Sequence, residues 1–415
     1  MNLSRRRFLS SVAGAAAVGS AAALAAACSA PTPVTAPTVG PTLSPTPSTP
    51  LKIGVLVPYT ESSISVDVGL NQKRAADLYL KNTGGWLGSR PTSLVYSAES
   101  IEAAINKVKV NTLLNTEKVD LLLGGARDET AAVMRDAADA AKLVFIDTNA
   151  TSNALTRANA SKYLFRTSAS AWQLSAPLGE WASRNGTKEF FVCAVDNATG
   201  LEFADAFVSG VGKNGGKATA RATFASGGDW SKAIAQIKGQ ATRNVFAAFD
   251  TDDAEGFLGE WMKQGLSSAG FTLSGPGFLT EQPVLDASTT VPVGVLTTHF
   301  WSPDVDNPEN KALVDQFPHE YVDDETGAPV ALSGYAVAMW DAMTALDIAL
   351  KDAQDAPTLV TALEAVSFKS PRGMFTFSKS HNPVHDIVIR ETRSVPNAKA
   401  TNVVVDRLPL IADPG

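Results

Sequence analysis

Short apolar runs alternate with longer stretches of helical periodicity between residues 51 and 300, and this alternation constrains the fold more than any other feature of the chain. Uninterrupted runs of Val, Ile, Leu and Phe are typical of parallel strands that helices cover on both faces. The pattern predicts strands at 52–58, 92–97, 119–124, 143–147, 189–195, 218–225, 244–250 and 291–300. Between them it predicts helices at 68–81, 101–114, 130–141, 172–184, 201–212, 230–239 and 254–264.

The part that follows residue 50 is long enough for two α/β domains in series. The chain has a net charge of −7, which becomes −10 without the three arginines at 5–7. Nucleic acid is not expected as a partner, because binding it requires clustered Lys and Arg side chains. Of the two cysteines, Cys193 lies in the apolar run 189–195, which predicts a buried thiol.

The first fifty residues read as an export signal followed by a tether. Residues 4–9, Ser-Arg-Arg-Arg-Phe-Leu, form a twin-arginine signature, and an uncharged Ala/Gly stretch follows that is too short for a convincing membrane span. We therefore predict a signal peptide over 1–27. Residues 28–50 are mostly Pro, Thr, Ser, Ala and Val without charge, a composition typical of an extended tether.

Cys28 ends the segment Leu-Ala-Ala-Ala-Cys, which resembles a bacterial lipobox, although the leucine stands one place further from the cysteine than usual. Two outcomes are open at this position. Either Cys28 is lipidated and anchors the protein to the membrane, or the signal is simply cleaved and the protein is released.

The carboxyl ends of the predicted strands carry the candidate site residues. In open parallel sheets, ligands bind beyond these ends, where loops and helix N-termini gather polar groups. Small residues mixed with hydroxyls, amides and carboxylates stand there at 58–61, 124–130, 147–152, 196–200 and 250–253. Helix capping and capture of a small polar ligand both explain such residues, and position alone does not separate the two roles.

Several of these segments, taken in order, resemble blocks of the Leu/Ile/Val-binding type of periplasmic binding protein. The blocks cover nearly all of residues 51–415 and stand at 52–58, 81–85, 123–129, 145–151, 163–167, 228–230, 275–277 and 332–336, together with the Asp250 loop.

The resemblance implies a type I binding-protein fold, in which two Rossmann-like α/β lobes are joined by three hinge strands and close on a ligand in the cleft between them. Lobe 1 would comprise 51–170 and 302–378, and lobe 2 would comprise 171–301 and 379–415. Such a protein is a monomer without a cofactor. It hands a small molecule to the permease subunits of an ABC importer.

In the family's amino-acid receptors, the ligand carboxylate is held by hydroxyls and backbone amides from two loops. The matching residues are Arg127 to Thr130 and Asn149, Ala150 and Thr151, and Thr151 matches a contacting threonine directly. The first loop departs from the family, since Arg127, Asp128 and Glu129 replace a Ser-rich turn. Arg127 either pairs with a ligand carboxylate or forms a salt bridge with Asp128, Glu129 or Asp147.

The second lobe departs further. The family's glutamate for the ligand ammonium falls at Gly277, and an aromatic contact falls at Thr251. Asp250, Asp252 or Glu281 could supply the missing carboxylate from a nearby position. The plainest inference is a ligand other than a branched-chain amino acid, and related receptors bind amides, urea-like compounds, short carboxylic acids and aromatic acids.

Further candidates come from the remaining strand ends. Asn197 and Thr199 are expected to contact the ligand, and Tyr59, Phe278 and Trp301 either line an apolar part of the pocket or belong to the core.

Catalytic motifs are not convincing when read in context. The Gly-x-Gly-x-x-Gly pattern at 210–215 ends a predicted helix instead of beginning one, and the four histidines, 299, 319, 381 and 385, are scattered. We therefore expect neither an enzyme nor a metal protein. A solute receptor for an ABC importer is favoured, and a surface sensor that uses the same cleft is the alternative.

Overall fold

The structure, a computed structural model, describes residues 49–415 except 61–63, 288–291, 324–325, 354 and 396–397. The side chains of 64–66, 251–252, 395 and 398–399 are also outside the description. The predicted signal peptide, most of the tether and Cys28 therefore lie outside the described residues. Within the described part, no helix is both long enough and apolar enough to cross a membrane.

The first sheet of the described chain has six strands in the order β2-β3-β1-β4-β5-β6. All its pairs are parallel except β2 with β3. The central strand β1 is almost entirely buried, which explains its unbroken apolar sequence. The strands are β1 (Leu51–Val57), β2 (Trp86–Leu87), β3 (Arg90–Ala98), β4 (Leu121–Gly124), β5 (Phe145–Asp147) and β6 (Leu164–Arg166). The helices between them are α1 (Ile64–Asn82), α2 (Ala103–Asn115) and α3 (Asp128–Ala141), and the short η1 (Asn153–Thr156) follows β5.

The second sheet follows the order β12-β13-β14-β11-β10-β9-β7-β8, and β15 pairs with β14. Its parallel part consists of β7 (Glu189–Val195), β8 (Lys217–Phe224), β9 (Asn244–Ala248), β10 (Thr272–Pro276) and β11 (Leu296–His299). Its antiparallel part consists of β12 (Ser367–Ser370), β13 (Gly373–Phe377), β14 (Pro383–Val395) and β15 (Ala398–Ile411). The accompanying helices are α4 (Ala171–Arg184), α5 (Ala198–Gly212), α6 (Trp230–Lys238), α7 (Thr251–Lys263), η2 (Gly277–Thr280) and α8 (Gln282–Ala287).

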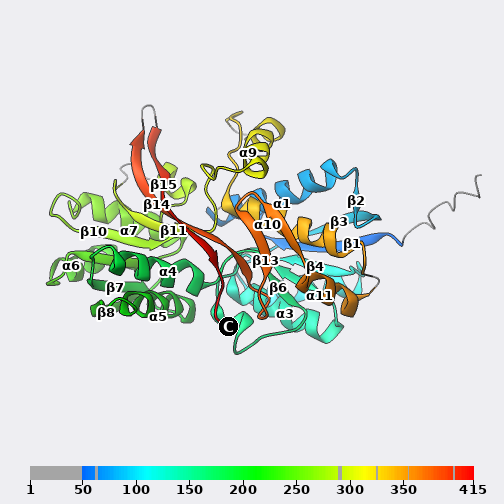
Figure 1. The fold of residues 1–415 in the computed structure, drawn as a ribbon, viewed down its shortest axis with the longest axis horizontal. Helices are drawn as coiled ribbons and strands as arrows, with labels where there is room; N and C mark the ends of the chain where they lie inside the picture. The colour runs from blue at the N-terminus through cyan, green and yellow to red at the C-terminus, as the bar shows by residue number, and fades with distance from the viewer. Residues whose placement is uncertain (1–48, 61–63, 288–291, 324–325, 354, 396–397) are drawn as a thin grey trace, which may run out of the picture. The chain divides into compact units, whose positions relative to one another are not determined.

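Three helices that follow β11 return to the side of the first sheet. They are α9 (Pro308–Glu320), α10 (Gly334–Ala349) and α11 (Ala356–Glu364). Helix α10 packs along α1, and the amide side chains of Gln316 and Asn82 exchange hydrogen bonds of 3.0 Å. The chain therefore passes between the two sheets at 167–170, at 300–302 and along β14 (Figure 1). This is the type I binding-protein fold that the sequence predicted.

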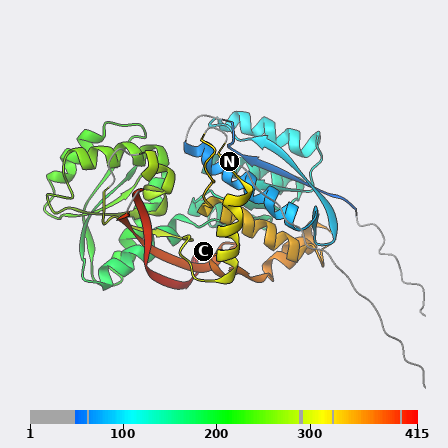
Figure 2. The same ribbon diagram turned by 90° about the horizontal axis from the view of Figure 1, so that it is seen from above.

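Strand β14 belongs to both sides of the molecule. It pairs with β13 through Pro383 and Val384 and with β11 through Val388 to Glu391. Between these stretches, the ladder with β15 is interrupted by a bulge from His385 to Ile387. Figure 2 shows the orange and red strands running between the green elements and the blue and cyan elements. Strand β14 pairs with strands on both sides of the molecule, so the order of strands does not assign it to one lobe. The lobe boundary expected between residues 378 and 379 therefore stays a prediction.

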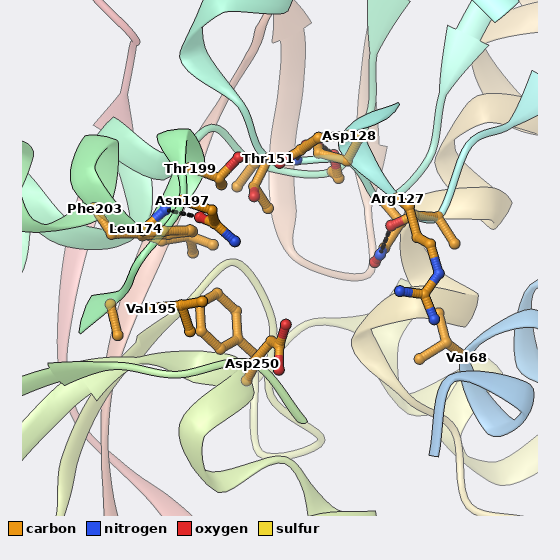
Figure 3. Close-up of a pocket in the computed structure, with 18 of the residues that line it drawn as sticks. Val68, Arg127, Asp128, Thr151, Leu174, Val195, Asn197, Thr199, Phe203 and Asp250 are labelled. Carbon is orange, nitrogen blue, oxygen red and sulfur yellow. Dashed lines mark hydrogen bonds between the residues drawn. The ribbon is translucent and has the colours of Figure 1, made fainter. Parts of the chain in front are cut away.

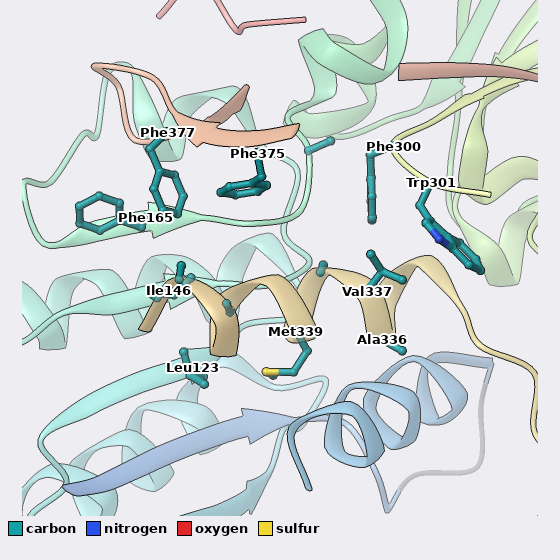
Figure 4. Close-up of a cluster of buried hydrophobic side chains, with 14 of the residues drawn as sticks. Leu123, Ile146, Phe165, Phe300, Trp301, Ala336, Val337, Met339, Phe375 and Phe377 are labelled. Atoms are coloured by element: carbon teal, nitrogen blue, oxygen red, sulfur yellow. The ribbon is translucent and has the colours of Figure 1, made fainter. Parts of the chain in front are cut away.

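A buried ion pair lies where the chain crosses. The guanidinium of Arg372 and the carboxylate of Asp341 are 2.6 Å apart, and both side chains are fully buried. Arg372 also donates to the Thr167 carbonyl at 2.5 Å and lies over the ring of Phe300 at 4.7 Å. The neighbouring core joins Phe300 and residues such as Phe375 to α10 (Figure 4). One cation thus contacts two of the three crossing segments.

Candidate functional site

A cavity of about 350 Å³ lies between the carboxyl ends of the two parallel sheets (Figure 3). Loops after β4 and β5 supply one side of it, and loops after β7, β9 and β10 supply the other. Polar lining residues are Arg127, Asp128, Glu129, Asn149, Thr151, Ser168, Asn197, Thr199, Ser226 and Asp250. Apolar and aromatic lining residues include Ala150, Leu174, Val195, Phe203, Phe278, His299, Phe300 and Tyr335.

Most of the predicted site residues are brought together here. Those that line the cavity are Arg127, Asp128, Asn149, Ala150, Thr151, Asn197, Thr199, Asp250 and Phe278.

The other predicted residues lie elsewhere or are only partly described. Tyr59 packs edge-to-face against Tyr96, with ring centroids 6.3 Å apart. Trp301 is buried and donates from Nε1 to Asn310 at 2.7 Å. Thr251 begins α7, but its side chain is outside the described residues. Neither Tyr59 nor Trp301 is among the described residues that line the cavity, so of the two roles left open for them, their positions favour packing over ligand contact.

The backbone amides of the first-lobe loops are already hydrogen-bonded to the protein's own carboxylates. Glu99, which follows β3, accepts from the amides of Ala126 and Arg127 at 2.8 and 3.0 Å. Asp147 accepts from the amides of Asn149 and Ala150 at 3.0 and 2.8 Å. These amides belong to the two loops that the family resemblance assigned to a ligand carboxylate.

Asp128 completes this arrangement and also bridges the cleft. Its Oδ1 accepts from the amides of Thr151 and Ser152, both at 2.8 Å. Its Oδ2 accepts at 2.6 Å from the hydroxyl of Thr199, at the start of α5 in the second lobe. Asp128 is therefore both a loop acceptor and a contact between the lobes.

A second carboxylate crosses the cleft beside it. Glu202 of α5 accepts from the amides of Asn153 and Ala154 at 2.5 and 3.2 Å, and from the hydroxyl of Ser152 at 3.3 Å. Burial raises the pKa of Glu202, and these hydrogen bonds oppose the rise. The first turn of α5 is thus held against the loop that follows β5.

Arg127 lies at the edge of the cavity, near Val68 of α1 (Figure 3). One of its predicted partners, Asp147, instead forms a fully buried salt bridge with Arg166 at 3.0 Å. Burial raises the pKa of Asp147 to about 6, although Arg166 opposes the rise. Arg127 is, among the described lining residues, the one with a permanent positive charge.

At Gly277, a histidine ring occupies the space that a larger side chain would need. A Cβ at Gly277 would lie 2.2 Å from Cδ2 of His299, and a Cβ at Gly334 would lie 2.3 Å from its Cε1. The Nε2 atom of His299 lies 3.1 Å from Glu281, and its Nδ1 accepts from the Trp301 amide at 3.1 Å. Burial lowers the pKa of His299, and the charge of Glu281 opposes the fall.

Glu281 does not line the cavity, because it lies behind this ring and pairs with Arg390 at 3.2 Å. Burial alone would raise the pKa of Glu281, but His299 and Arg390 lower it to about 2. Its charge is therefore balanced inside the second lobe. Of the carboxylates suggested for the missing glutamate, Asp250 lines the cavity and Glu281 does not, while the Asp252 side chain is outside the described residues.

A family model described as "Periplasmic binding protein" matches residues 50–398. The chain belongs to the periplasmic binding protein family. This periplasmic binding protein is 27% identical over 374 residues to "Leu/Ile/Val-binding protein homolog 6" of Brucella suis biovar 1, with 88% of this chain and 93% of the relative covered. Members of the family bind small molecules and work with the permeases of ABC transporters.

Solved structures share the fold of this periplasmic binding protein. A solute-binding protein of an ABC transporter from Rhodopseudomonas palustris, in complex with benzoate, is 29% identical, with a TM-score of 0.77 over 88% of this chain and 98% of that one. The branched-chain amino acid binding protein of Streptococcus pneumoniae, in complex with isoleucine, is 18% identical, with a TM-score of 0.72 over 85% of this chain and all of that one. Its similarity shows the fold alone.

Sequence reasoning missed several residues of this binding protein's cleft. Glu202 stands inside a predicted helix, which the strand-end rule does not reach. Glu99 follows a predicted strand but was not proposed as a site residue, and Tyr335 and His299 were not predicted to line the cavity. A carboxylate at the end of a predicted strand, Glu99, was the one available signal. The described residues contain no cluster of His, Cys, Asp or Glu that could hold a metal ion.

Proposed function

We propose that this protein is the extracytoplasmic solute-binding receptor of an ABC importer, and that it closes on a small carboxylate-bearing ligand in the cavity between its lobes. One observation carries the proposal: the cavity joins a guanidinium from the first lobe to an aromatic wall from the second. Its volume of about 350 Å³ is within the range of small-ligand pockets.

The two ends of the cavity suit different parts of such a ligand. Arg127 offers the planar fork that pairs with a carboxylate. On the other side, Phe203 and Phe278 meet edge-to-face with ring centroids 5.0 Å apart and present apolar surface beside Leu174. The predicted contacts that line the cavity, with Asp128, Asn149, Thr151, Asn197 and Thr199 as polar members, are proposed as the ligand-binding residues.

A small carboxylic acid with an apolar or aromatic body is the ligand we favour. The Rhodopseudomonas neighbour holds benzoate, which has this chemistry. Glu281, a candidate for binding an ammonium group, is paired with Arg390 away from the cavity. An amino acid would instead place its ammonium group near Asp250, and an amide is the third possibility among small polar ligands.

We further propose that the protein is exported and held at the outer face of the cytoplasmic membrane by a lipid on Cys28, with residues 28–50 as the tether. Palmitate labelling of the expressed protein, with Cys28→Ala as the control, tests this proposal. Label that persists in the Cys28→Ala variant would contradict it.

A thermal-shift panel on residues 29–415, refolded beforehand to remove carried ligand, tests the receptor function. A ligand at 100 times its dissociation constant should add about 2.7 kcal/mol to the free energy of unfolding. Stabilisation by benzoate or short carboxylic acids supports the proposal. Stabilisation by amino acids alone would assign Asp250 to the ammonium group, and no stabilisation across the panel would contradict the receptor function.

A further inference from the structure

Glu99 is a buried carboxylate directly beneath the loop that presents Arg127. Its side chain is 1% exposed, and its two oxygens accept from two consecutive amides, those of Ala126 and Arg127, at 2.8 and 3.0 Å. Two hydrogen bonds from adjacent amides to one carboxylate are the arrangement by which a loop before a helix binds an anion. Here the anion is part of the protein.

The start of α3 explains why this carboxylate matters. Arg127 is the N-cap residue, with an extended backbone at φ −107° and ψ 147°, and its own side chain makes no capping hydrogen bond. The amides at a helix start need acceptors, and a negative charge there interacts favourably with the helix dipole. Glu99 supplies both from the end of β3, which β1 separates from β4, and the Arg127 side chain lies at the cavity edge.

The same principle recurs along the first-lobe side of the cavity. Asp147 accepts from two consecutive amides, at 149 and 150, and Asp128 accepts from two more, at 151 and 152. Both loops therefore present amides whose hydrogen bonds are already made to internal carboxylates. A ligand carboxylate that approached them would meet these negative charges.

We propose that Glu99 is a positioning residue for ligand recognition: it occupies the amides of Ala126 and Arg127, so that the Arg127 guanidinium receives the ligand carboxylate in their place. This assignment rests on the function proposed above, in which a ligand carboxylate enters the cavity. It predicts that the planar guanidinium of Arg127 binds both carboxylate oxygens through two parallel hydrogen bonds. Ligands whose carboxylate lies in the plane of an apolar body suit such a donor. Lysine at 127 would not replace arginine, because an ammonium lacks the fork.

Protonation of Glu99 gives a readout that a purely structural residue lacks. Burial raises its pKa to about 7, while its hydrogen bonds from Ala126, Thr130 and Arg127 and the charge of Arg127 oppose the rise. Other charged groups near it are Asp128 and Glu129 at the start of α3, and Lys109 of α2, which donates to the adjacent Ala98 carbonyl. When Glu99 gains a proton, one oxygen becomes a donor, and the hydrogen bonds that the carboxyl group accepts from the two amides weaken because its charge is lost.

The test measures benzoate binding by titration calorimetry in the wild-type chain and in Glu99→Ala, Glu99→Gln and Asp120→Ala. Asp120 is the matched control, since it also accepts from a backbone amide, that of Lys52 at 2.8 Å, but stands before β4, at the end of the sheet away from the cavity. We expect Glu99→Ala to weaken binding about tenfold or more and Asp120→Ala to leave it unchanged.

Two further measurements separate positioning from folding. Millimolar formate should strengthen benzoate binding in Glu99→Ala by filling the vacated site, whereas in the wild type it can only compete. Affinity should rise from pH 6 to pH 8 in the wild type and stay level in Glu99→Gln.

The outcomes distinguish the two proposals. If the wild-type protein binds no carboxylic acid, the proposed function fails. If it binds benzoate but folded Glu99→Ala binds equally well, the role of Glu99 is overturned. Should Glu99→Ala fail to fold, a Glu99→Gln variant that keeps the wild-type pH dependence would overturn it.

Discussion

Buried carboxylates around the cavity change their pKa in opposite directions, according to what lies beside them. Glu99 has no buried cation that outweighs its loss of water, so its pKa rises to about 7. Asp147 has Arg166 beside it, yet burial still raises its pKa to about 6. Glu281 lies between His299 and Arg390, which together lower its pKa to about 2. Neighbouring charge, and not burial alone, therefore decides which of these groups binds a proton near neutral pH.

The raised pKa of Glu99 predicts how stability depends on pH. Between its ordinary pKa of 4.5 and about 7, the folded protein holds a proton that the unfolded chain releases, so this group's contribution to stability falls as the pH rises through that window. The full shift corresponds to about 3 kcal/mol. Urea unfolding at pH 5 and pH 8 should show a smaller difference in Glu99→Gln than in the wild type. Equal differences in the two proteins would contradict the prediction.

The close approach of His299 to Gly277 gives a second prediction at this scale. Gly277→Ala places a Cβ 2.2 Å from the ring, so His299 must move away from Glu281. We expect a loss of about 1–3 kcal/mol in the free energy of unfolding. Gly259→Ala is the control, since a Cβ there meets nothing within 4 Å. A Gly277→Ala protein as stable as the control in urea would contradict the described packing.

Helix α5 is the element that links the two lobes beside the cavity. Its first residues place Thr199 and Glu202 against Asp128 and the loop after β5. Hydrogen bonds across a cleft favour the closed arrangement, and a ligand binds more weakly when the competent arrangement is less populated. The start of α5 is therefore expected to raise the affinity for a ligand by holding the cleft closed, and Glu202 need not contact the ligand for this effect.

Removing these contacts should open the cleft. We expect the double variant Thr199→Val and Glu202→Gln to have a larger radius of gyration by X-ray scattering without ligand and to bind benzoate about tenfold more weakly. Asp205→Asn is the control, because Asp205 lies on the same helix and pairs at 2.5 Å with exposed Arg221. An unchanged radius of gyration in the double variant would show that these contacts do not hold the cleft closed.

Elements with a simple apolar pattern could be predicted from the sequence, and those with buried polar residues could not. Helix α3 shows buried Ala131, Met134 and Ala138 at helical spacing, and it was predicted to within a turn. Strand β14 was missed because it buries His385, Arg390 and Thr392, which break the alternation expected of a strand. Strand β10 was missed because it ends in Ser-Gly-Pro, which is typical of a turn, and β6 was missed although it is as long as the predicted β5.

The site could be predicted only in part for a related reason. The strand-end rule located the loops that line the cavity, because it depends on local order along the chain. The hydrogen bond between Glu99 and Ala126 joins residues 27 positions apart, and that between Thr199 and Asp128 joins residues 71 positions apart. The pairing of carboxylates with amides depends on which strands and lobes lie side by side. This arrangement cannot be deduced from a single sequence.

At the scale of the whole molecule, the crossing segments are held together by Arg372 and Asp341. A buried charge without its partner is strongly unfavourable, whereas an apolar pair of similar volume is often tolerated. Losing one member of the ion pair is therefore expected to lower the free energy of unfolding by more than the intact pair itself contributes to it.

We expect Arg372→Leu alone to lower the free energy of unfolding by about 3 kcal/mol or more, since Asp341 would remain buried beside the crossing segments. The double variant Arg372→Leu and Asp341→Leu should recover much of the loss. Calorimetric unfolding of the wild type and both variants provides the measurement. A double variant less stable than Arg372→Leu would show that the two side chains do not act as a pair.

Strand β14 is hydrogen-bonded to β13 at one end and to β11 further along, with the bulge from His385 to Ile387 between. A strand fixed at both ends can bend only where its ladder is irregular, and a bulge is such a place. Rotation of one lobe against the other is therefore expected to concentrate within a few peptide units. In a deuterium-uptake experiment, the peptide that contains this bulge should exchange more slowly when a ligand is bound, although His385 and Ile387 are not among the described residues that line the cavity.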